Sequence, residues 1–389
     1  MKYGVGLWFS LALLSPISAA SGQSLPTYPA VRPSGRLQFD GARYFPDIKH
    51  LVSGTELRRL RLAVGGDLSQ RLHFLIEIDF ADNEVLVRDA WLTYDLNPHL
   101  RLQAGHFKEP LSLDQLTSSL DISFMERSLI DGVVPGRNLG IAVRGNYRGV
   151  TGMLGGFGQN AGSIGEPDFD NSEAIGMSMR LTAAPVQRER RLIHLGAAAR
   201  WRTPDAQADD DRNTSFDAPD ETNVDRTVFY DTGNISQTDW YGQFGVEGAL
   251  IYGPLFLQAE GMATQVSRDT VTDPSFGGGY VFLSVIPTGE ARIYDARNGV
   301  IGSITAPRHK WGALELLVRW STIDLNEGVI TGGAGHNWTL AANWYPQRNL
   351  KMMVNYVITD HDVFATGDGQ YAAPDNFRVL QARLQYFFR

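Results

Sequence analysis

An alternation of apolar and polar residues with period two recurs from one end of this sequence to the other. In LRRLRLAV, Leu60, Leu62 and Val64 share one face, while Arg59 and Arg61 lie on the other. The segments HFLIEIDF and VLQARLQYFFR repeat this pattern, and helical periodicity of any length is almost absent. Because successive side chains of a β-strand point to opposite faces, this period predicts strands with one apolar and one polar face. The chain is therefore expected to be all-β.

The alternating segments are long enough to cross a membrane, since a tilted transmembrane strand needs about 9 to 11 residues. Tight connections such as NPH, YRG and YGP alternate with longer ones, as in barrels with short periplasmic turns and long external loops. A soluble β-sandwich is the alternative, but its outer faces should be polar. The sequence thus predicts a 16-stranded antiparallel transmembrane β-barrel with strands near 36–45, 55–66, 72–80, 84–96, 100–108, 138–147, 150–157, 173–183, 192–202, 240–251, 254–266, 279–287, 310–323, 336–345, 350–359 and 377–388.

The N-terminus has the pattern of an export signal. Lys2 supplies a positive charge, and the apolar run Val5–Leu14 is too short to span a bilayer, which takes about 20 residues. Small residues up to Ala20 then offer a cleavage site. We therefore expect three parts: a secretory signal peptide at 1–20, an N-terminal extension at 21–34 and one barrel domain at 35–389.

The formal charge of the chain is −8, which argues against a nucleic-acid partner. Much of this charge lies between residues 203 and 225, where eight acids face one base, Arg212. We expect a solvated, mobile loop there. A weak calcium site at Asp209–Asp211 is the alternative, although this segment lacks the spacing and the Gly of a dedicated calcium loop.

A long insert, residues 109–137, interrupts the rhythm of short turns at the third external connection. Ser112 and Gln115 form a capping box, which predicts a short helix. The helix would carry apolar side chains along one side, and these would be exposed to water if the insert stayed outside the barrel. We therefore expect the insert to fold inward, to pack on the barrel wall through Leu113, Leu116 and Leu120, and to narrow the pore.

Several motifs resemble one known family, the phosphate-selective porins O and P. They are GTELRRLRLAVGG, VRDAWLTYDL, LQAGHFKEPLSL, LTSSLDISFMERSL, TGEARIYD and WGALELLVRWSTIDL, in the order in which that family has them. The resemblance implies a sixteen-stranded outer-membrane barrel, usually trimeric, whose third loop folds into the lumen. It also implies that anions pass through a narrow, arginine-lined channel.

The resemblance assigns candidate residues. Arg58 and Arg59 in ELRR match paired arginines near the constriction, Asp89 in VRDAW matches an acid that shapes it, and Arg127 in FMER lies on the inserted loop. Alternation alone places Arg59 and Arg61 in the lumen but Arg58 on the lipid-facing side.

Further arginines extend this set. Alternation points Arg144 and Arg319 inward, and Arg292 in TGEARIYD would reach the lumen from a long periplasmic connection at 288–309. Each inward arginine either contacts solute or pairs with a wall carboxylate, and the sequence leaves both open. The candidate channel and anion-binding residues are Arg58, Arg59, Arg61, Asp89, Arg127, Arg144, Arg292 and Arg319.

Enzyme signatures such as GxSxG, HExxH and GxxxxGK are not found, so we expect no enzyme, cofactor or metal site. The expected function is an outer-membrane porin for small anions such as phosphate or polyphosphate. Selectivity for organic anions or general small solutes is an alternative, because the insert lacks the lysines that the family's selective members place around the constriction. A structural or adhesive barrel is a further one. Expected partners besides solutes are outer-membrane lipids and lipopolysaccharide, two further copies in a homotrimer, and the barrel-assembly machinery.

Overall fold

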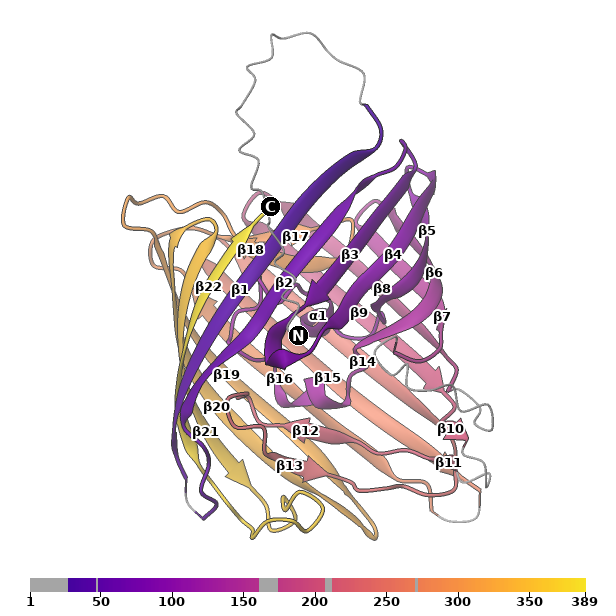
Figure 1. Ribbon diagram of the computed structural model, residues 1–389, viewed down its shortest axis with the longest axis vertical. Helices are drawn as coiled ribbons and strands as arrows, with labels where there is room; N and C mark the ends of the chain where they lie inside the picture. The colour runs from indigo at the N-terminus through magenta and orange to yellow at the C-terminus, as the bar shows by residue number, and fades with distance from the viewer. Residues whose placement is uncertain (1–26, 47, 161–173, 207–211, 270–271) are drawn as a thin grey trace, which may run out of the picture.

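In the computed structural model, residues 27–46, 48–160, 174–206, 212–269 and 272–389 are described. Sixteen antiparallel strands form a closed barrel, in which the first strand pairs with the last (Figure 1). The barrel strands are β1 (Ala30–Phe45), β2 (Gly54–Asp67), β3 (Leu72–Asp79), β4 (Leu86–Asn97), β5 (Leu100–Lys108), β6 (Arg137–Tyr147), β7 (Val150–Phe157), β8 (Gly176–Arg188), β9 (Arg191–Arg202), β14 (Thr238–Tyr252), β15 (Leu255–Arg268), β16 (Ser275–Val285), β19 (Ala313–Glu327), β20 (Ile330–Gln347), β21 (Leu350–His361) and β22 (Arg378–Phe388).

Each of the sixteen expected strands coincides with a barrel strand, so the predicted fold class is confirmed. The largest differences are at β1 and β20, which begin at Ala30 and Ile330 and not at 36 and 336. On β2 the apolar face points outward, where Leu62 and Val64 are half exposed, and Arg61 is buried inside. The barrel thus has apolar side chains on its outer surface and polar side chains inside.

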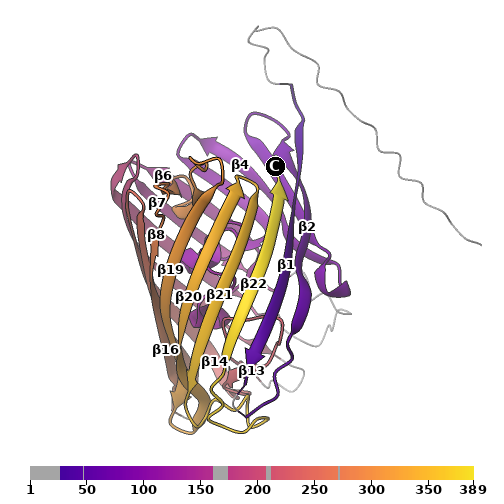
Figure 2. The ribbon, with the colours of Figure 1, turned by 90° about the vertical axis from the view of Figure 1, so that its left-hand side faces the viewer.

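The two ends of the barrel differ (Figure 2). At the end that holds the C-terminus, here named the terminal end, connections such as 68–71, 98–99 and 148–149 are short. The opposite, loop end carries longer ones, including the hairpins β10 (Asp205–Ala206) with β11 (Arg212–Asn213) and β12 (Asp217–Pro219) with β13 (Val228–Asp231). One long connection, 286–312, lies at the terminal end and forms the hairpin of β17 (Arg292–Asp295) and β18 (Val300–Ile304).

Aromatic side chains mark the outer rim of the barrel. Tyr94, Tyr147, Tyr252 and Trp344 are exposed near the terminal end, as expected of an interfacial girdle. Tyr345 is different: it points inward and donates a hydrogen bond to a wall carboxylate. No helix in the described part of the chain is long and apolar enough to cross a membrane.

Candidate functional site

The insert between β5 and β6, residues 109–136, lies inside the barrel (Figure 1). It begins with α1 (Leu113–Leu116), which Ser112 caps by accepting a hydrogen bond from the Gln115 backbone N–H at 3.1 Å. Glu260 on β15 accepts from the first two backbone N–H groups of α1, at 2.8 and 2.7 Å. Those N–H groups have no partner within a helix, so the carboxylate satisfies them and fixes the insert to the wall.

The middle of the insert is tied to the opposite strands. Gln385, Lys351 and Asn343 donate to backbone carbonyls within residues 120–123, at 3.0, 2.7 and 2.7 Å. These donors come from β22, β21 and β20, so the insert is bonded to the wall on that side of the lumen. It ends in the 3₁₀ helix η2 (Leu129–Val133).

Apolar packing supports these bonds. Leu113 is fully buried, and the Phe124 ring meets Phe282 of the wall edge to face, with centroids 5.4 Å apart. Leu120 is also buried, but Leu116 faces the cavity described below. The expected single stripe is therefore divided, and Leu116 does not hold the insert to the wall.

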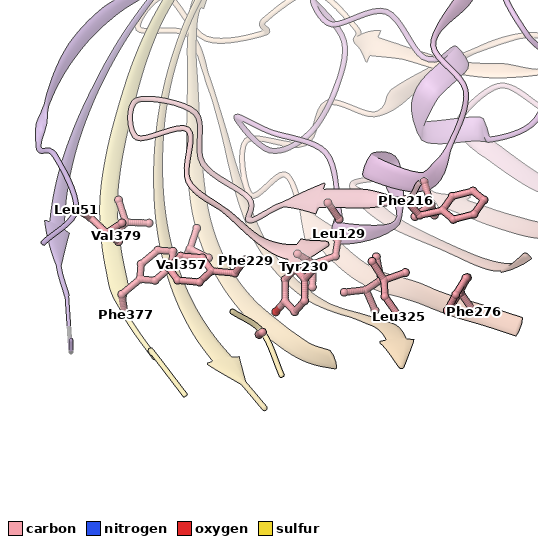
Figure 3. Close-up of a cluster of buried hydrophobic side chains, with 14 of the residues drawn as sticks. Leu51, Leu129, Phe216, Phe229, Tyr230, Phe276, Leu325, Val357, Phe377 and Val379 are labelled. Atoms are coloured by element: carbon pink, nitrogen blue, oxygen red, sulfur yellow. The ribbon is translucent and has the colours of Figure 1, made fainter. Parts of the chain in front are cut away.

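A second segment enters from the loop end: the plug loop, here residues 212–237 before β14. Phe216, Phe229 and Tyr230 of this loop are buried in a cluster with Phe377 and residues of the barrel wall (Figure 3). Burial of three aromatic rings supplies several kcal/mol, at about 25 cal/mol per Å². The plug loop is therefore a packed part of the barrel interior.

Carboxylates fix the tip of the plug loop. Glu221 forms an ion pair with Arg319 at 2.5 Å and accepts from Ser321 and Thr339. The expectation of a solvated, mobile loop is thus wrong for this tip, because inward-facing cations and hydroxyls of the wall bind its acids. Asp209–Asp211, the alternative calcium site, lie outside the described residues.

The hairpin β17–β18 enters from the terminal end and supports the insert from that side. Arg292 forms an ion pair with Glu315 of β19 at 2.6 Å and donates to the Asp121 backbone oxygen at 2.8 Å. The expected reach of Arg292 into the lumen is confirmed, but its guanidinium is buried against Glu315.

These three segments leave a cavity of about 520 Å³ beside the wall formed by β1 to β8. Its lining holds ten cationic side chains and four carboxylates. The cations are Arg36, Arg59, Arg61, Arg101, Lys108, Arg127, Arg137, Arg144, Arg180 and Arg389, and the acids are Glu77, Asp89, Asp121 and Asp295. A chain with a net charge of −8 therefore presents a positive surface to this passage.

A β-bulge decides where Arg58 lies. In the register of β1 and β2, Gln38 pairs with Arg59 and Phe39 with Leu57, so Arg58 is an extra residue. A bulge interrupts the alternation of faces, and here it turns Arg58 inward beside Arg59. The predicted lipid-facing position of Arg58 is therefore wrong.

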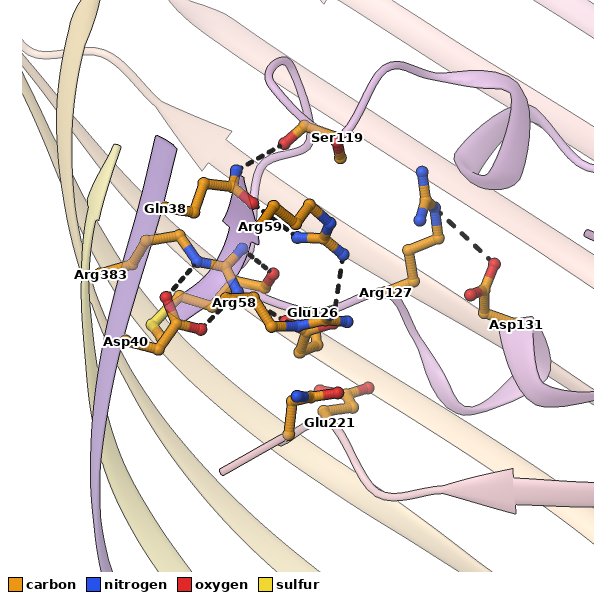
Figure 4. Close-up of polar contacts among 12 residues, drawn as sticks. Gln38, Asp40, Arg58, Arg59, Ser119, Glu126, Arg127, Asp131, Glu221 and Arg383 are labelled. Carbon is orange, nitrogen blue, oxygen red and sulfur yellow. Dashed lines mark hydrogen bonds and ion pairs between the residues drawn. The ribbon is translucent and has the colours of Figure 1, made fainter. Parts of the chain in front are cut away.

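The two arginines converge on the insert (Figure 4). Arg58 donates twice to the Glu126 carboxylate, both at 2.9 Å, and Arg59 lies 3.9 Å from it. Arg383 on β22 pairs with the same carboxylate at 2.6 Å. Burial opposes ionisation of Glu126, but the field of Arg58, Arg383 and Arg59 outweighs it and holds the pKa of this carboxyl well below its usual range.

Two more cations hold the C-terminal end of α1. Lys108 Nζ donates to the backbone oxygens of Gln115 and Thr117, and Arg127 Nε donates to that of Asp114 at 2.9 Å. Carbonyl groups at a helix end lack internal partners, and cations there are stabilising.

A carboxyl group completes this side of the constriction. Arg127 Nε lies 3.7 Å from Asp131. Burial raises the pKa of the Asp131 carboxyl to about 6, and the charge of Arg127 opposes the rise only in part.

Two arginines of the described cavity lining have a buried Nε without an acceptor. The Nε atoms of Arg59 and Arg144 have no hydrogen-bond acceptor in the part of the chain that the structure describes. Arg144 donates instead through other nitrogens, to Asn298 and to the Met153 sulfur. These Nε atoms are buried, but Arg59 lies as far as 3.9 Å from Glu126, and those two side-chain partners of Arg144 are neutral. A guanidinium without a close carboxylate is suited to bind a passing anion through its other nitrogens.

The eight candidate residues separate into two groups. Five line the cavity: Arg59, Arg61, Asp89, Arg127 and Arg144. Arg58, Arg292 and Arg319 do not; they pair with Glu126, Glu315 and Glu221 and brace the inner segments.

Sequence reasoning missed Lys108 and Arg137, which flank the insert and are direct partners in the β5–β6 register. Both residues stand directly at the ends of the insert, and this position in the sequence could have identified them as candidates. Asp89 binds Arg137 at 2.8 Å, so this acid orients a cation of the lining. Among the described residues, no three His, Asp or Glu side chains gather as a metal site.

The family model for the phosphate-selective porins O and P matches residues 31–388. This chain belongs to that family. It is 24% identical to Porin O of Pseudomonas aeruginosa over 393 residues, which cover 91% of this chain and 87% of that protein. An uncharacterized protein of Caulobacter vibrioides is 30% identical over 350 residues, with 86% of this chain and 68% of the relative covered.

Solved structures support the same architecture. The anion-selective porin from Comamonas acidovorans superposes with a TM-score of 0.57 at 14% identity, covering 92% of this chain and 99% of that one. The trimer form of OmpT, an outer membrane protein of Vibrio cholerae, gives 0.55 at 12% identity, covering 92% and 99%. At such identities the likeness concerns the fold alone. Family and fold together make this protein an outer-membrane porin, a channel.

Proposed function

We propose that this porin carries small anions, such as phosphate or polyphosphate, by passive diffusion through the cavity beside β1 to β8. The observation that carries the proposal is the lining, with ten cations against four carboxylates in a chain whose net charge is −8. Charges inside a narrow, partly dry passage are screened less than charges in bulk salt, where the Debye length is about 8 Å. The lining therefore sets selectivity more than the total charge does.

Anions would be bound weakly and in succession. Most lining arginines already have a carboxylate partner, as Arg36 has Glu77 at 2.6 Å and Arg101 has Asp95 at 2.5 Å. Such pairs weaken the binding of an anion at each arginine, and weak binding allows the anion to leave as well as to enter. Arg59 and Arg144 line the cavity without a close carboxylate partner among the described residues and are proposed as the main contact points.

Broader selectivity is the second candidate, and one observation favours it. Lys108 is the only lysine of the cavity lining described here, and its Nζ is bound to backbone carbonyls of the insert. Phosphate would thus meet arginines that are mostly paired, with no free lysine beside them. We infer an anion preference with little discrimination among anions of similar size.

We also propose a location and an assembly, which the family and the fold support. The apolar outer surface suits the outer membrane, with lipids and, on the outer leaflet, lipopolysaccharide around it. We place the terminal end in the periplasm and propose export by a signal peptide at residues 1–20, which lie outside the described part, and insertion by the barrel-assembly machinery. A homotrimer is proposed, supported by the trimer form of the OmpT structure.

The test is a planar-bilayer recording of chloride current with increasing phosphate. Phosphate should reduce the current at millimolar concentration in the wild type, and Arg59→Gln should weaken this block. Arg348→Gln, a change on an exposed turn, is the control and should leave it unaltered. No phosphate effect together with cation preference would refute the proposal, and no permeation in liposome swelling would favour a structural or adhesive barrel.

A further inference from the structure

We infer that the preferred solutes of this channel are organic anions that carry an apolar, above all aromatic, body beside a carboxylate or phosphate group. The inference rests on the proposed function, since it names the solute class for the same cavity. It starts from apolar side chains in the cavity lining, which the transport of an inorganic anion does not require. Inward positions of the β1 to β8 wall are mostly polar, but Leu75 and Trp91 also face the cavity and remain partly exposed.

Leu75 and Trp91 belong to one apolar row that runs across the wall. They are direct cross-strand partners on β3 and β4. The register extends the row to both sides without a polar side chain, through Gly65, Leu75, Trp91, Gly105, Gly140 and Phe157. The wall thus carries a continuous apolar band from β2 to β7, which ends on the β1 side at Arg32, the partner of Gly65.

Glycines make room for the large side chains of this row. A Cβ at Gly140 would lie 2.5 Å from the Phe157 ring. Gly105, beside Trp91, has a φ of 127°, and a Cβ there would lie 2.2 Å from the Ala90 carbonyl oxygen. Side chains larger than Gly are therefore excluded at both positions, at Gly140 by the Phe157 ring and at Gly105 by the backbone of β4.

Trp91 is also held in place. It packs against a buried cluster of Phe107, Ala142, Met153 and Phe157, in which the rings of Phe107 and Phe157 meet edge to face with centroids 5.4 Å apart. A fixed indole that is still partly exposed offers a flat contact surface at little entropic cost to the protein.

The inner segments also contribute apolar side chains to the cavity, among polar ones such as Ser118 and Asn298. Leu116 of the insert and Val300 and Ile301 of the β17–β18 hairpin line the same space. An apolar solute body would therefore find apolar contacts on the inner segments as well as on the wall. Exposed apolar surface of this kind, enclosed by polar groups, is a common mark of a binding site.

The apolar band lies close to the cations. Asp89, which binds Arg137, is two residues from Trp91 on the same strand, about 7 Å along it. Toward the terminal end, Arg101 is the cross-strand partner of Asp95, four residues from Trp91. A solute about the size of an aryl phosphate or benzoate can thus place its anionic group at an arginine while its ring contacts Trp91.

The test compares phenyl phosphate with inorganic phosphate as blockers of chloride current in planar bilayers. In the wild type, phenyl phosphate should block at about five-fold lower concentration, the effect expected of one added aromatic contact. Trp91→Gln should remove most of this difference, measured as the ratio of the two blocking concentrations in the same variant channel. Trp91→Phe should keep it, which separates ring contact from a general loss of structure.

Equal block by the two anions in the wild type would overturn the inference and leave the proposed function standing. The same holds if the difference persists in a folded Trp91→Gln channel. This wild-type comparison needs no variant, so it decides even if a variant fails to fold. If neither anion blocks and the channel prefers cations, the proposed function itself is refuted.

Discussion

Replacing Leu113 by Asn should displace the insert from the wall. The leucine is fully buried and lies beside the Glu260 anchor. Truncating a buried leucine costs about 2 to 5 kcal/mol, and an unsatisfied amide in its place costs about 1 to 3 more. Since about 1.4 kcal/mol corresponds to a factor of ten, even the lower end of the summed cost, about 3 kcal/mol, raises the ratio of displaced to seated insert by about two orders of magnitude.

Single-channel recording reveals this change directly. The Leu113→Asn channel should show higher or fluctuating conductance, whereas the wild type is steady. Leu116→Asn is the matched control, because Leu116 lies one helical turn away but faces the cavity, and it should leave the conductance steady. Equal effects of the two variants, or none in a folded Leu113→Asn channel, would refute the packing described for the insert.

Three other predictions concern single carboxyl groups. Glu126→Gln removes the negative charge between Arg58, Arg59 and Arg383, so reversal potentials should show a stronger anion preference. A weaker anion preference would contradict the ion pairs described for Glu126. Glu221→Gln leaves Arg319 buried without its counter-charge, and the thermal unfolding midpoint should fall by an amount that reflects about 3 to 5 kcal/mol; an unchanged midpoint would argue against a fixed plug loop. The pKa of Asp131, about 6, exceeds that of an exposed carboxyl, so its protonated form stabilises the fold below about pH 4 and this contribution is lost as pH rises through 6. Protonation also removes a negative charge beside Arg127. Anion preference should therefore rise as the pH is lowered from 7.5 to 5, and it should not rise in Asp131→Asn.

The barrel could be predicted because lipid and water on the two faces impose period two on every strand. Strand number followed from that pattern together with turn segments. Leu62 and Arg61 illustrate it, since they are neighbours in sequence and lie on opposite faces. Only strand ends differed, where hydrogen bonds continue past the apolar segment.

The position of Arg58 could not be predicted by counting. A bulge adds one residue to one strand, and nothing in ELRR marks where the extra residue stands. The register with β1 is needed, because Gln38 and Phe39 show which residue of β2 is skipped.

The plug loop was misjudged because its charges were weighed without its aromatic residues. Asp220 and Glu221 favour solvent only if they stay unpaired, whereas here wall groups bind them. Phe216, Phe229 and Tyr230 were the signal for burial. Likewise, arginines that brace inner segments, such as Arg292 and Arg319, carry the same sequence pattern as arginines that line the cavity. Only the tertiary partners distinguish them.

The central claim, that local charge in the cavity and not total charge sets selectivity, is tested most directly by the reversal potential across a potassium chloride gradient. The wild type should prefer chloride despite its net charge of −8. Arg59→Gln combined with Arg144→Gln should shift the potential toward zero, and Arg348→Gln should not. Cation preference in the wild type, or no shift in the folded double variant, would contradict the account.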